Sequence, residues 1–369
     1  MSDATAIRDT GVPRACVAAP VPGPQCRVTE AGDTRDAQWD GYVLAHPEGT
    51  VFHTTAWRSA VREAFRHEAV YLTALRGDRI VGVLPMFLVA SRLAGRMLVS
   101  VPYAVGGGII ADDEDAVGML FNAAKDLAEE RRCTTIELRS ERAAIRSLPA
   151  ADRYVGFRRD LPTGVSDVLR SLPRKARAAA RNARDKFQLT VSFGDEHLHN
   201  VWQLYSINMR RLGSLTYPFR FFERLIGYTP GRHWVSLVKW DSRPVAGLVT
   251  FLFKDRVIPY FFGATDDARR CSAANYIYLT AMERGVEEGF RVFDFGRSRR
   301  DNPGSYNFKR FQGFEPHSLG YQCYTAPGHG PPNLSPSNPK YRFARKLWTH
   351  LPLWVTQAAG ARIARHIPG

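Results

Sequence analysis

The residues best suited to chemistry lie in the stretch 293–316, which reads FDFGRSRRDNPGSYNFKRFQGFEP. Its first residues have the pattern of a strand, and the carboxyl edge of such strands is where open α/β sheets usually bind ligands. A turn at Asn302–Gly304 would bring the following residues back to that edge. We therefore expect these side chains to converge there: Asp294, Arg297, Ser298, Tyr306, Phe308 and Lys309.

Lys309 is the candidate for the chemical step. Acyl transfer to an amine builds negative charge on the carbonyl oxygen, and a fixed cation in a water-poor site stabilises that charge. The alternative is that Lys309 is an exposed lysine on a strand and that the aromatic residues around it belong to the core. No GxSxG motif is present, and no cysteine stands at an interpretable spacing from a histidine. The sequence therefore does not support a covalent acyl-enzyme.

A second candidate site immediately precedes the helix that we expect to begin near Asn275. Acyl-CoA acyltransferases of the GNAT type have an Arg/Gln-x-x-Gly-x-Gly/Ala loop there, whose backbone amides hold the pyrophosphate at the helix N-terminus. This chain is similar in spacing, with Arg269-x-x-Ser272-x-Ala274, but serine replaces the first glycine and restricts close approach of the backbone. Arg269, Arg270 and Asn275 are thus candidates for binding a phosphate-bearing donor such as acyl-CoA.

The segment Arg170–Phe187 carries seven Lys or Arg residues and one Asp. After Pro173 its spacing predicts a helix with a row of arginines on one face. The substrate-binding candidates in this row are Arg174, Arg177 and Arg181, and Arg184 continues it. Together with a formal net charge of +15, the row indicates an anionic partner, such as a phosphate-bearing substrate, tRNA or a lipid headgroup. A solvated helix face on a generally basic surface is the alternative.

Composition narrows the class of protein. The five cysteines are scattered and never form a CxxC pair, and the ten histidines contain no HExxH pair, so we expect neither a disulfide framework nor a metal site. No apolar run reaches the roughly 20 residues of a membrane-spanning helix, and the N-terminus lacks the pattern of a secretory signal. The sequence therefore predicts a cytoplasmic protein.

Two similar halves are expected to position the candidate residues. In the first half the expected order is helix, hairpin, strand, helix and strand, over residues 56–65, 71–89, 96–101, 117–128 and 136–140. The same order follows in the second half, where Arg243 and Phe251 repeat the spacing of Arg79 and Phe87. A chance match of order and spacing is the alternative to an ancient duplication. We expect an α/β (α+β) fold with a mixed central sheet in each half, flanked by helices.

The expected elements divide the chain into four parts. They are a flexible tail over 1–26, a first domain over 27–165, a second domain over 166–325 that begins with the basic helix, and a closing part over 326–369. The closing part consists of a Pro-rich loop and a basic amphipathic segment. That segment suits a peripheral membrane contact, and packing on its own domain is the alternative.

Several stretches, in this order, resemble the Fem-like proteins, a family of transferases with two tandem GNAT-fold domains. They are LPRKARAAARNAR, NMRRLGSLTYP, IPYFFGA, SAANYIY, FDFGRS and YNFKRFQGFEP. The closing LSPSNPKYRFARKLWTHLPLWV is similar to the tail of the subgroup associated with exosortase and PEP-CTERM exopolysaccharide systems. The resemblance covers about residues 38–369.

The resemblance implies transfer of an acyl or aminoacyl group to an amine of a cell-envelope or exopolysaccharide precursor. Phe308-Lys309 matches the family's Phe-Lys pair, which implies a place near the aminoacyl end of the donor, and Tyr260 in the matching IPYFFGA stretch is a further substrate-binding candidate. The donor is then acyl-CoA or aminoacyl-tRNA, although Pro173–Leu189 leaves no room for the long helical arm of tRNA-dependent members. The alternatives are an acyl-CoA-dependent N-acyltransferase acting on a small molecule and a non-catalytic protein that binds an anionic polymer.

Overall fold

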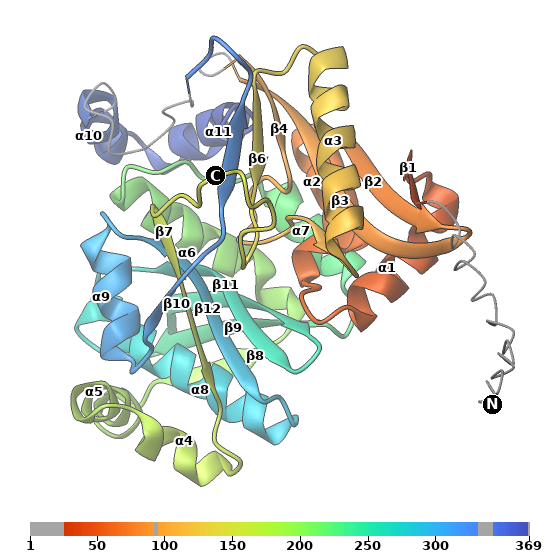
Figure 1. Ribbon diagram of the computed structural model, residues 1–369. Helices are drawn as coiled ribbons and strands as arrows, with labels where there is room; N and C mark the ends of the chain where they lie inside the picture. The colour runs from red at the N-terminus through yellow and green to blue at the C-terminus, as the bar shows by residue number, and fades with distance from the viewer. Residues whose placement is uncertain (1–25, 92–94, 331–341, 368–369) are drawn as a thin grey trace, which may run out of the picture.

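Two mixed β-sheets flanked by helices form the protein, as the sequence predicts (Figure 1). The structure is a computed structural model that describes the 369-residue chain except for residues 1–25, 92–94, 331–341 and 368–369. The expected tail over 1–26 lies outside the described residues apart from Cys26, which begins the first strand. Most of the expected loop over 326–340 lies outside them as well.

The first half supplies most of one sheet and the helices around it. Its main elements are β1 (Cys26–Glu30), α1 (Asp36–Ala45), α2 (Thr55–Phe65), β2 (Glu68–Arg76), β3 (Arg79–Ser91), β4 (Gly95–Val99), β5 (Ile110–Ala111), α3 (Glu114–Glu130) and β6 (Thr135–Leu138). The strand order is β1-β2-β3-β4-β6-β14, with β5 paired to β3. Within this sheet β4 and β6 run parallel, whereas the other pairs are antiparallel. The predicted helices, hairpin and strands of this half are therefore confirmed.

The second half repeats this plan. The chain continues with β7 (Tyr154–Asp160), which belongs to the expected first domain, and then with α4 (Val165–Ser171), α5 (Arg174–Asp185), β8 (Thr190–Phe193), α6 (Leu198–Arg211), α7 (Phe219–Tyr228), β9 (His233–Trp240) and β10 (Arg243–Phe253). They are followed by β11 (Arg256–Ala264), α8 (Ala273–Glu287), β12 (Val292–Arg299), α9 (Pro303–Phe311), β13 (Pro316–Ser318), β14 (Gln322–Thr325), α10 (Arg342–His350) and α11 (Leu353–Ala364). The order of the second sheet is β13-β7-β12-β11-β10-β9-β8. Arg79 and Arg243, which the repeat pairs, begin the equivalent strands β3 and β10.

Local sequence explains where these elements begin and turn. The β2–β3 hairpin closes at Gly77, whose φ of 62° is a left-handed conformation that glycine adopts without strain. The Thr54 hydroxyl accepts a hydrogen bond from the backbone N–H of Trp57 and caps α2. The expected turn at Asn302–Gly304 was wrong. Asn302 instead caps α9, with Pro303 in the first turn, because proline fits the start of a helix, where the amide has no partner.

The two sheets exchange strands. Strand β7 follows the first half in the chain but pairs with β12 and β13 in the second sheet. Strand β14 follows the second half but pairs antiparallel with β6 at the edge of the first sheet. Each sheet therefore contains one strand from the part of the chain that we assigned to the other domain. The domain boundary that we expected between 165 and 166 stays a prediction, and strand pairing crosses it in both directions.

One hydrophobic core spans both halves. The Trp57 ring of α2 meets the edges of Phe221 in α7 and Phe251 in β10, with ring centroids 6.0 and 5.6 Å apart. Tyr260 of β11 packs on the same indole at 5.4 Å. Because these side chains are shared, the halves are packed as one body around α2 and α7.

The last two helices pack on α6 of the second half. The Trp348 indole N–H donates to the carbonyl oxygen of Ser214, and Gly360 lies against Thr216, where a Cβ would come within 3.0 Å of the backbone. Trp354 nevertheless is 70% exposed and Leu347 54% exposed. Among the described residues, no helix is both long and apolar enough to cross a membrane. Peripheral membrane contact through this segment stays a prediction.

Candidate functional site

The second sheet opens between β11 and β12. These parallel strands pair only at Arg256 with Val292 and at Val257 with Phe293, and beyond these residues they separate. Strand β11 also contains an extra residue, Tyr260, opposite β10, because Thr250 pairs with Pro259 and Val249 with Phe261. Strand separation and such a bulge leave backbone groups that other parts of the molecule, or a ligand, must satisfy.

Lys309 of α9 contacts β12 just beyond the residues that pair with β11, and it is only 8% exposed. Its Nζ donates to the carbonyl oxygens of Phe295 at 2.7 Å, Gly296 at 3.2 Å and Arg297 at 2.8 Å. A lysine ammonium has three N–H donors, so backbone carbonyls engage all of them. Lys309 is therefore a buried helix residue rather than an exposed lysine on a strand.

Burial also sets the charge state of Lys309. Loss of water around the amine lowers its pKa to about 7, and the nearby Arg297 acts in the same direction, whereas Asp294 opposes them. Two aromatic rings contribute to the enclosure, since Nζ lies 5.3 Å from the ring centroid of Phe157 and 5.8 Å from that of Phe295. Near pH 7, Lys309 thus exchanges between ammonium and amine.

The carbonyls held by Lys309 belong to a bulge in β12. Asp294 pairs with Arg158 and Arg297 with Gly156, so two residues of β12 face a single residue of β7. Gly296, one of the two, has a φ of 63°, and its N–H donates to the Asp294 carboxylate at 2.8 Å. Bulges of this kind redirect neighbouring side chains. Lys309 therefore fixes the backbone that carries Asp294 and Arg297.

A small pocket lies next to the bulge, between the two halves, with room of about 40 Å³ for water-sized molecules. The second half contributes Asp294, Gly296 and Arg256 to its wall, and the first half contributes Thr50 and Glu141. The remaining lining is largely apolar and includes Phe52, Val105, Phe253, Ile258 and Leu319. This combination of apolar walls and a few polar groups is typical of small-molecule sites.

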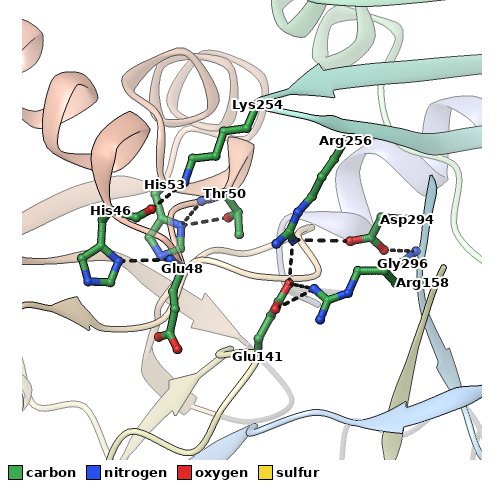
Figure 2. A network of polar contacts seen from close by, with 10 residues as sticks. All are labelled: His46, Glu48, Thr50, His53, Glu141, Arg158, Lys254, Arg256, Asp294 and Gly296. Carbon is green, nitrogen blue, oxygen red and sulfur yellow. Dashed lines mark hydrogen bonds and ion pairs between the residues drawn. The ribbon is translucent and has the colours of Figure 1, made fainter. Parts of the chain in front are cut away.

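Glu141 joins the halves across this pocket (Figure 2). Its carboxylate accepts from Arg158 at 2.9 Å and from Arg256 at 3.1 Å, and Arg256 also lies 3.9 Å from Asp294. Burial alone would raise the pKa of Glu141, but the two arginines outweigh it and hold that pKa below its usual value. Burial raises the pKa of Asp294 instead. Two neighbouring carboxyl groups whose pKa values shift in opposite directions are suited to different roles.

The histidine and lysine on the other side of the pocket have structural roles. His53 is buried, and its ring contacts Thr50 through Nδ1 and the Gly108 carbonyl oxygen through Nε2 at 3.0 Å. Burial lowers the pKa of His53 to about 4, so the ring is neutral and both nitrogens are occupied. Lys254, in the turn between β10 and β11, donates to the carbonyl oxygen of His46 at 2.5 Å and thereby links this turn to the first half (Figure 2).

The structure brings several predicted residues to this region. The Arg297 guanidinium lies 4.4 Å from the ring centroid of Tyr154 and donates to the hydroxyl of Tyr321 at 3.2 Å. Tyr260 donates to the carbonyl oxygen of Tyr103 at 2.6 Å and so ties β11 to the first half. The other predicted residues lie on or beside the bulge. The hydroxyl groups of Ser298 and Ser305 form a hydrogen bond of 2.8 Å. The Tyr306 ring packs on Phe157, and the Phe308 ring packs on Tyr278 and Phe295.

The basic residues of the sequence analysis lie elsewhere. Arg269 and Arg270 are exposed before α8, where Ser272 has a φ of 56° and forms no side-chain cap, and Asn275 is half-buried in the first turn. Helix α5 packs on α8 and lies at the lower left of Figure 1, away from the first half. The row Arg174, Arg177 and Arg181 is therefore separate from the pocket.

Glu141, Arg158, Arg256 and His317 line or border the pocket, and we did not single them out from the sequence. They come from different strands, and no motif connects them. Glu141 alone had a usable signal, because it directly follows the strand predicted over 136–140 and thus stands at a carboxyl edge, as Asp294 does. Its arginine partners, Arg158 and Arg256, could not be predicted, because they come close to Glu141 only through the arrangement of the strands in space.

Comparison with known proteins identifies the fold. Residues 166–310 match the family model described as an acetyltransferase (GNAT) domain. A search of curated proteins gave no match to the sequence. The crystal structure of FemX is similar, with a TM-score of 0.63 and 15% identity, covering 86% of this chain and 100% of that chain. A tandem GNAT protein from the clavulanic acid biosynthesis pathway has a TM-score of 0.53 and 14% identity, covering 83% and 99%. The chain therefore has the tandem GNAT fold.

Proposed function

We propose that the protein transfers an acyl or aminoacyl group to an amine, with the reacting carbonyl beside the β12 bulge of the second half. The observation that carries this proposal is Lys309, a buried cation that holds the bulge through three hydrogen bonds at the point where β11 and β12 separate. The GNAT match supports it, because residues 166–310 include both strands and Lys309.

Lys309 acts in this proposal through its position and its charge. Its three N–H groups already have acceptors, and the bond to Gly296 is the longest of them at 3.2 Å. An oxyanion that forms nearby would compete for this donor, while the other two bonds keep the amine in place. A charge held in advance in a dry site stabilises a developing oxyanion more effectively than one that must move into position.

In the described part of the first half, the equivalent position is closed. Where β4 and β6 separate, the Gly108 N–H donates to the Arg139 carbonyl oxygen, and the buried Arg139 side chain donates to the carbonyl oxygens of Val101 and Ala104. Helix α3, the counterpart of α8, begins with a capping aspartate, Asp113, and has further acids in its first turn. Those charges disfavour phosphate. We therefore assign the reaction to the second half and a wall of the pocket to the first.

The acceptor is, in this proposal, an amine of a cell-envelope or exopolysaccharide precursor. The resemblance of the sequence to Fem-like proteins, and the similarity of the fold to FemX, support an envelope component. The finer assignment to an exosortase-associated system depends on the similarity of the closing segment alone.

Acyl-CoA is the donor favoured by one specific observation. Helix α8 begins without an acidic residue in its first turn and without a side-chain cap, and two exposed arginines precede it. Such a helix N-terminus attracts phosphate. Aminoacyl-tRNA is the second candidate, because Fem-like proteins use it.

Donor retention tests the proposal. The purified protein is incubated with a mixture of acyl-CoA thioesters and charged tRNA, and bound species are identified by native mass spectrometry, followed by a transfer assay with amines. We expect a CoA species to be retained by the native protein and lost in Ser272→Glu, which places a carboxylate at the start of α8. Asn200→Glu, an exposed position in the first turn of α6, is the matched control.

The outcomes separate the alternatives. Retention of charged tRNA alone, unaffected by Ser272→Glu, would assign an aminoacyl donor. Binding of an anionic polymer that weakens with salt, with no transfer to any amine, would favour a non-catalytic protein and contradict the proposal.

A further inference from the structure

His317 occupies an unusual position in the second sheet. Strand β13 pairs with β7, and His317 stands opposite Gly156. A Cβ placed on Gly156 would come within 2.3 Å of Nε2 of His317 and 2.6 Å of its Cε1. The imidazole therefore lies over the backbone of β7, in the space that any other residue at position 156 would fill. This orientation directs it towards β12, where Arg297 pairs with the same glycine.

The ring reaches the pocket between the halves. His317 lines that pocket together with Asp294, Gly296 and Glu141. Among the described residues, none makes a hydrogen bond to its side chain, whereas both ring nitrogens of His53, close to the pocket, have contacts with Thr50 and Gly108. His317 is half-buried. Its imidazole is thus held by packing and still has a nitrogen available to a molecule in the pocket.

Burial and two arginines keep His317 neutral. Burial lowers its pKa below the ordinary value of 6.5, and Arg158 and Arg256 act in the same direction. Asp294 and Glu141 oppose this effect without reversing it. At neutral pH the ring is therefore in the form that accepts a proton.

We propose that the pocket between the halves binds the acceptor as a primary amine on an aliphatic chain, and that His317 removes the proton that the amine loses before attack. This inference rests on the proposed function. Glu141 is held by Arg158 and Arg256, so the Asp294 carboxylate, which lies 3.9 Å from Arg256, is the group that attracts the ammonium. Apolar residues such as Phe52, Ile258 and Leu319 line the space for the chain. The pocket adjoins Gly296, so an amine there is next to the bulge held by Lys309.

The ammonium gives one proton to His317, and the neutral amine attacks the carbonyl carbon of an acyl thioester or ester donor. A C–N bond forms and the C–S or C–O bond of the donor breaks, with the electron pair leaving on sulfur or oxygen. The nitrogen loses a second proton to solvent, and the proton on His317 passes to the leaving group. General base catalysis of this kind contributes about 10²–10⁴-fold.

Two variants test the role of His317. His317→Gln removes the base, and Gly156→Ala keeps the base but forces its ring out of the observed position. We expect both to reduce the rate of transfer by about a hundredfold or more while the donor is retained in native mass spectra as by the native protein. His199→Gln, on the exposed surface of α6, is the control. Thermal unfolding followed by circular dichroism shows whether each variant is folded.

Amine binding supplies a readout that does not depend on turnover. The probe is 1,5-diaminopentane, with 1,5-pentanediol as the matched ligand without amines, and the ring signals of His317 are followed by NMR. We expect the diamine to shift these signals and the diol not to do so. A folded His317→Gln protein with native turnover and native pH dependence would overturn the role of His317 and leave the proposed function intact. Shifts with both ligands, or with neither, would overturn the amine site. Lack of donor retention and of transfer by the native protein would contradict the proposed function instead.

Discussion

At the residue scale, the candidate site depends on two titratable groups with opposite requirements. Lys309 must be protonated to stabilise an oxyanion, and its pKa is lowered to about 7 by burial. His317 must be unprotonated to accept a proton, and burial and arginines lower its pKa below 6.5. Both groups have the required form between the pKa of His317, which lies below 6.5, and the pKa of Lys309 at about 7.

This interval predicts a bell-shaped dependence of transfer on pH. As the pH falls, His317 becomes protonated and the rate decreases. As the pH rises through about 7, Lys309 loses its charge and the rate decreases again. The measurement is the rate of transfer at saturating donor from pH 5 to 9. His317→Gln should abolish the acidic limb, and a limb that persists unchanged in this variant would assign it to another group.

Replacement of Lys309 gives a second prediction at this scale. Lys309→Met should reduce the rate of transfer by about a hundredfold or more, because the variant lacks the cation and the three hydrogen bonds to the bulge. Lys309→Arg keeps a charge at all accessible pH values, so the residual activity of that variant should lack the alkaline limb. Native turnover in a folded Lys309→Met protein would contradict the assignment.

The convergence of Lys309 with Arg297 and Asp294 could be predicted from the sequence, because strand edges and the next element tend to meet. Its burial could not. Asn302 and Pro303 are as typical of a helix start as of a turn, and only the packing of Tyr306 and Phe308 on the sheet decides between them. For the same reason, the three backbone acceptors of Lys309 were beyond sequence reasoning.

At the scale of elements, the sequence correctly predicts that α5 is a helix, but it does not decide whether the arginines of this helix bind an anion. Its alanines, Ala176, Ala180 and Ala183, are buried against α8, as expected for the face opposite the arginines. Arg174 and Arg181 are exposed, and Arg177 donates to the carbonyl oxygen of Arg170. Among the described residues, no carboxylate forms an ion pair with these three arginines. Binding of an anion by this row stays a prediction.

The salt dependence of binding tests this row. Replacement of Arg174, Arg177 and Arg181 together by Gln should weaken binding of unfractionated tRNA and reduce the slope of log K against log salt concentration by about 2–3. Arg184→Gln is the matched control on the same helix, because Arg184 already lies near the carboxylates of Asp185 and Glu283. An identical slope in the triple variant and the native protein would make the row ordinary surface.

At the scale of the whole molecule, the duplication seen in the sequence is real in the order of elements but incomplete in their pairing. The spacing of Arg79 and Arg243 correctly marks equivalent strands. Periodicity, however, says which face of a strand is buried and not which strand lies beside it. The exchange of β7 and β14, and with it the meeting of Glu141 with Arg158, therefore could not be predicted.

Because β14 pairs with β6, we expect a destabilising substitution in β14 to destabilise the first half as well. Gln322 is buried, and its side-chain amide bonds to the backbone of Ile145 and Leu148 in the first half. Gln322→Ala should lower the free energy of unfolding by roughly 2–4 kcal/mol, because it leaves buried backbone groups without partners. Hydrogen exchange should increase in β6 as well as in β14. Cys323→Ala, at the neighbouring half-buried position, is the control, and exchange confined to β14 would contradict coupling between the halves.

The exchanged strands also govern the order of events during synthesis on the ribosome. Strand β6 emerges early, but its partner β14 at Gln322–Thr325 is made only after the whole of the second sheet. Until then the nascent chain presents an unpaired strand edge, which is a ready template for association with other chains. A chaperone that shields this edge, or slow release of the chain, would thus affect the yield of native protein more than its stability once folded.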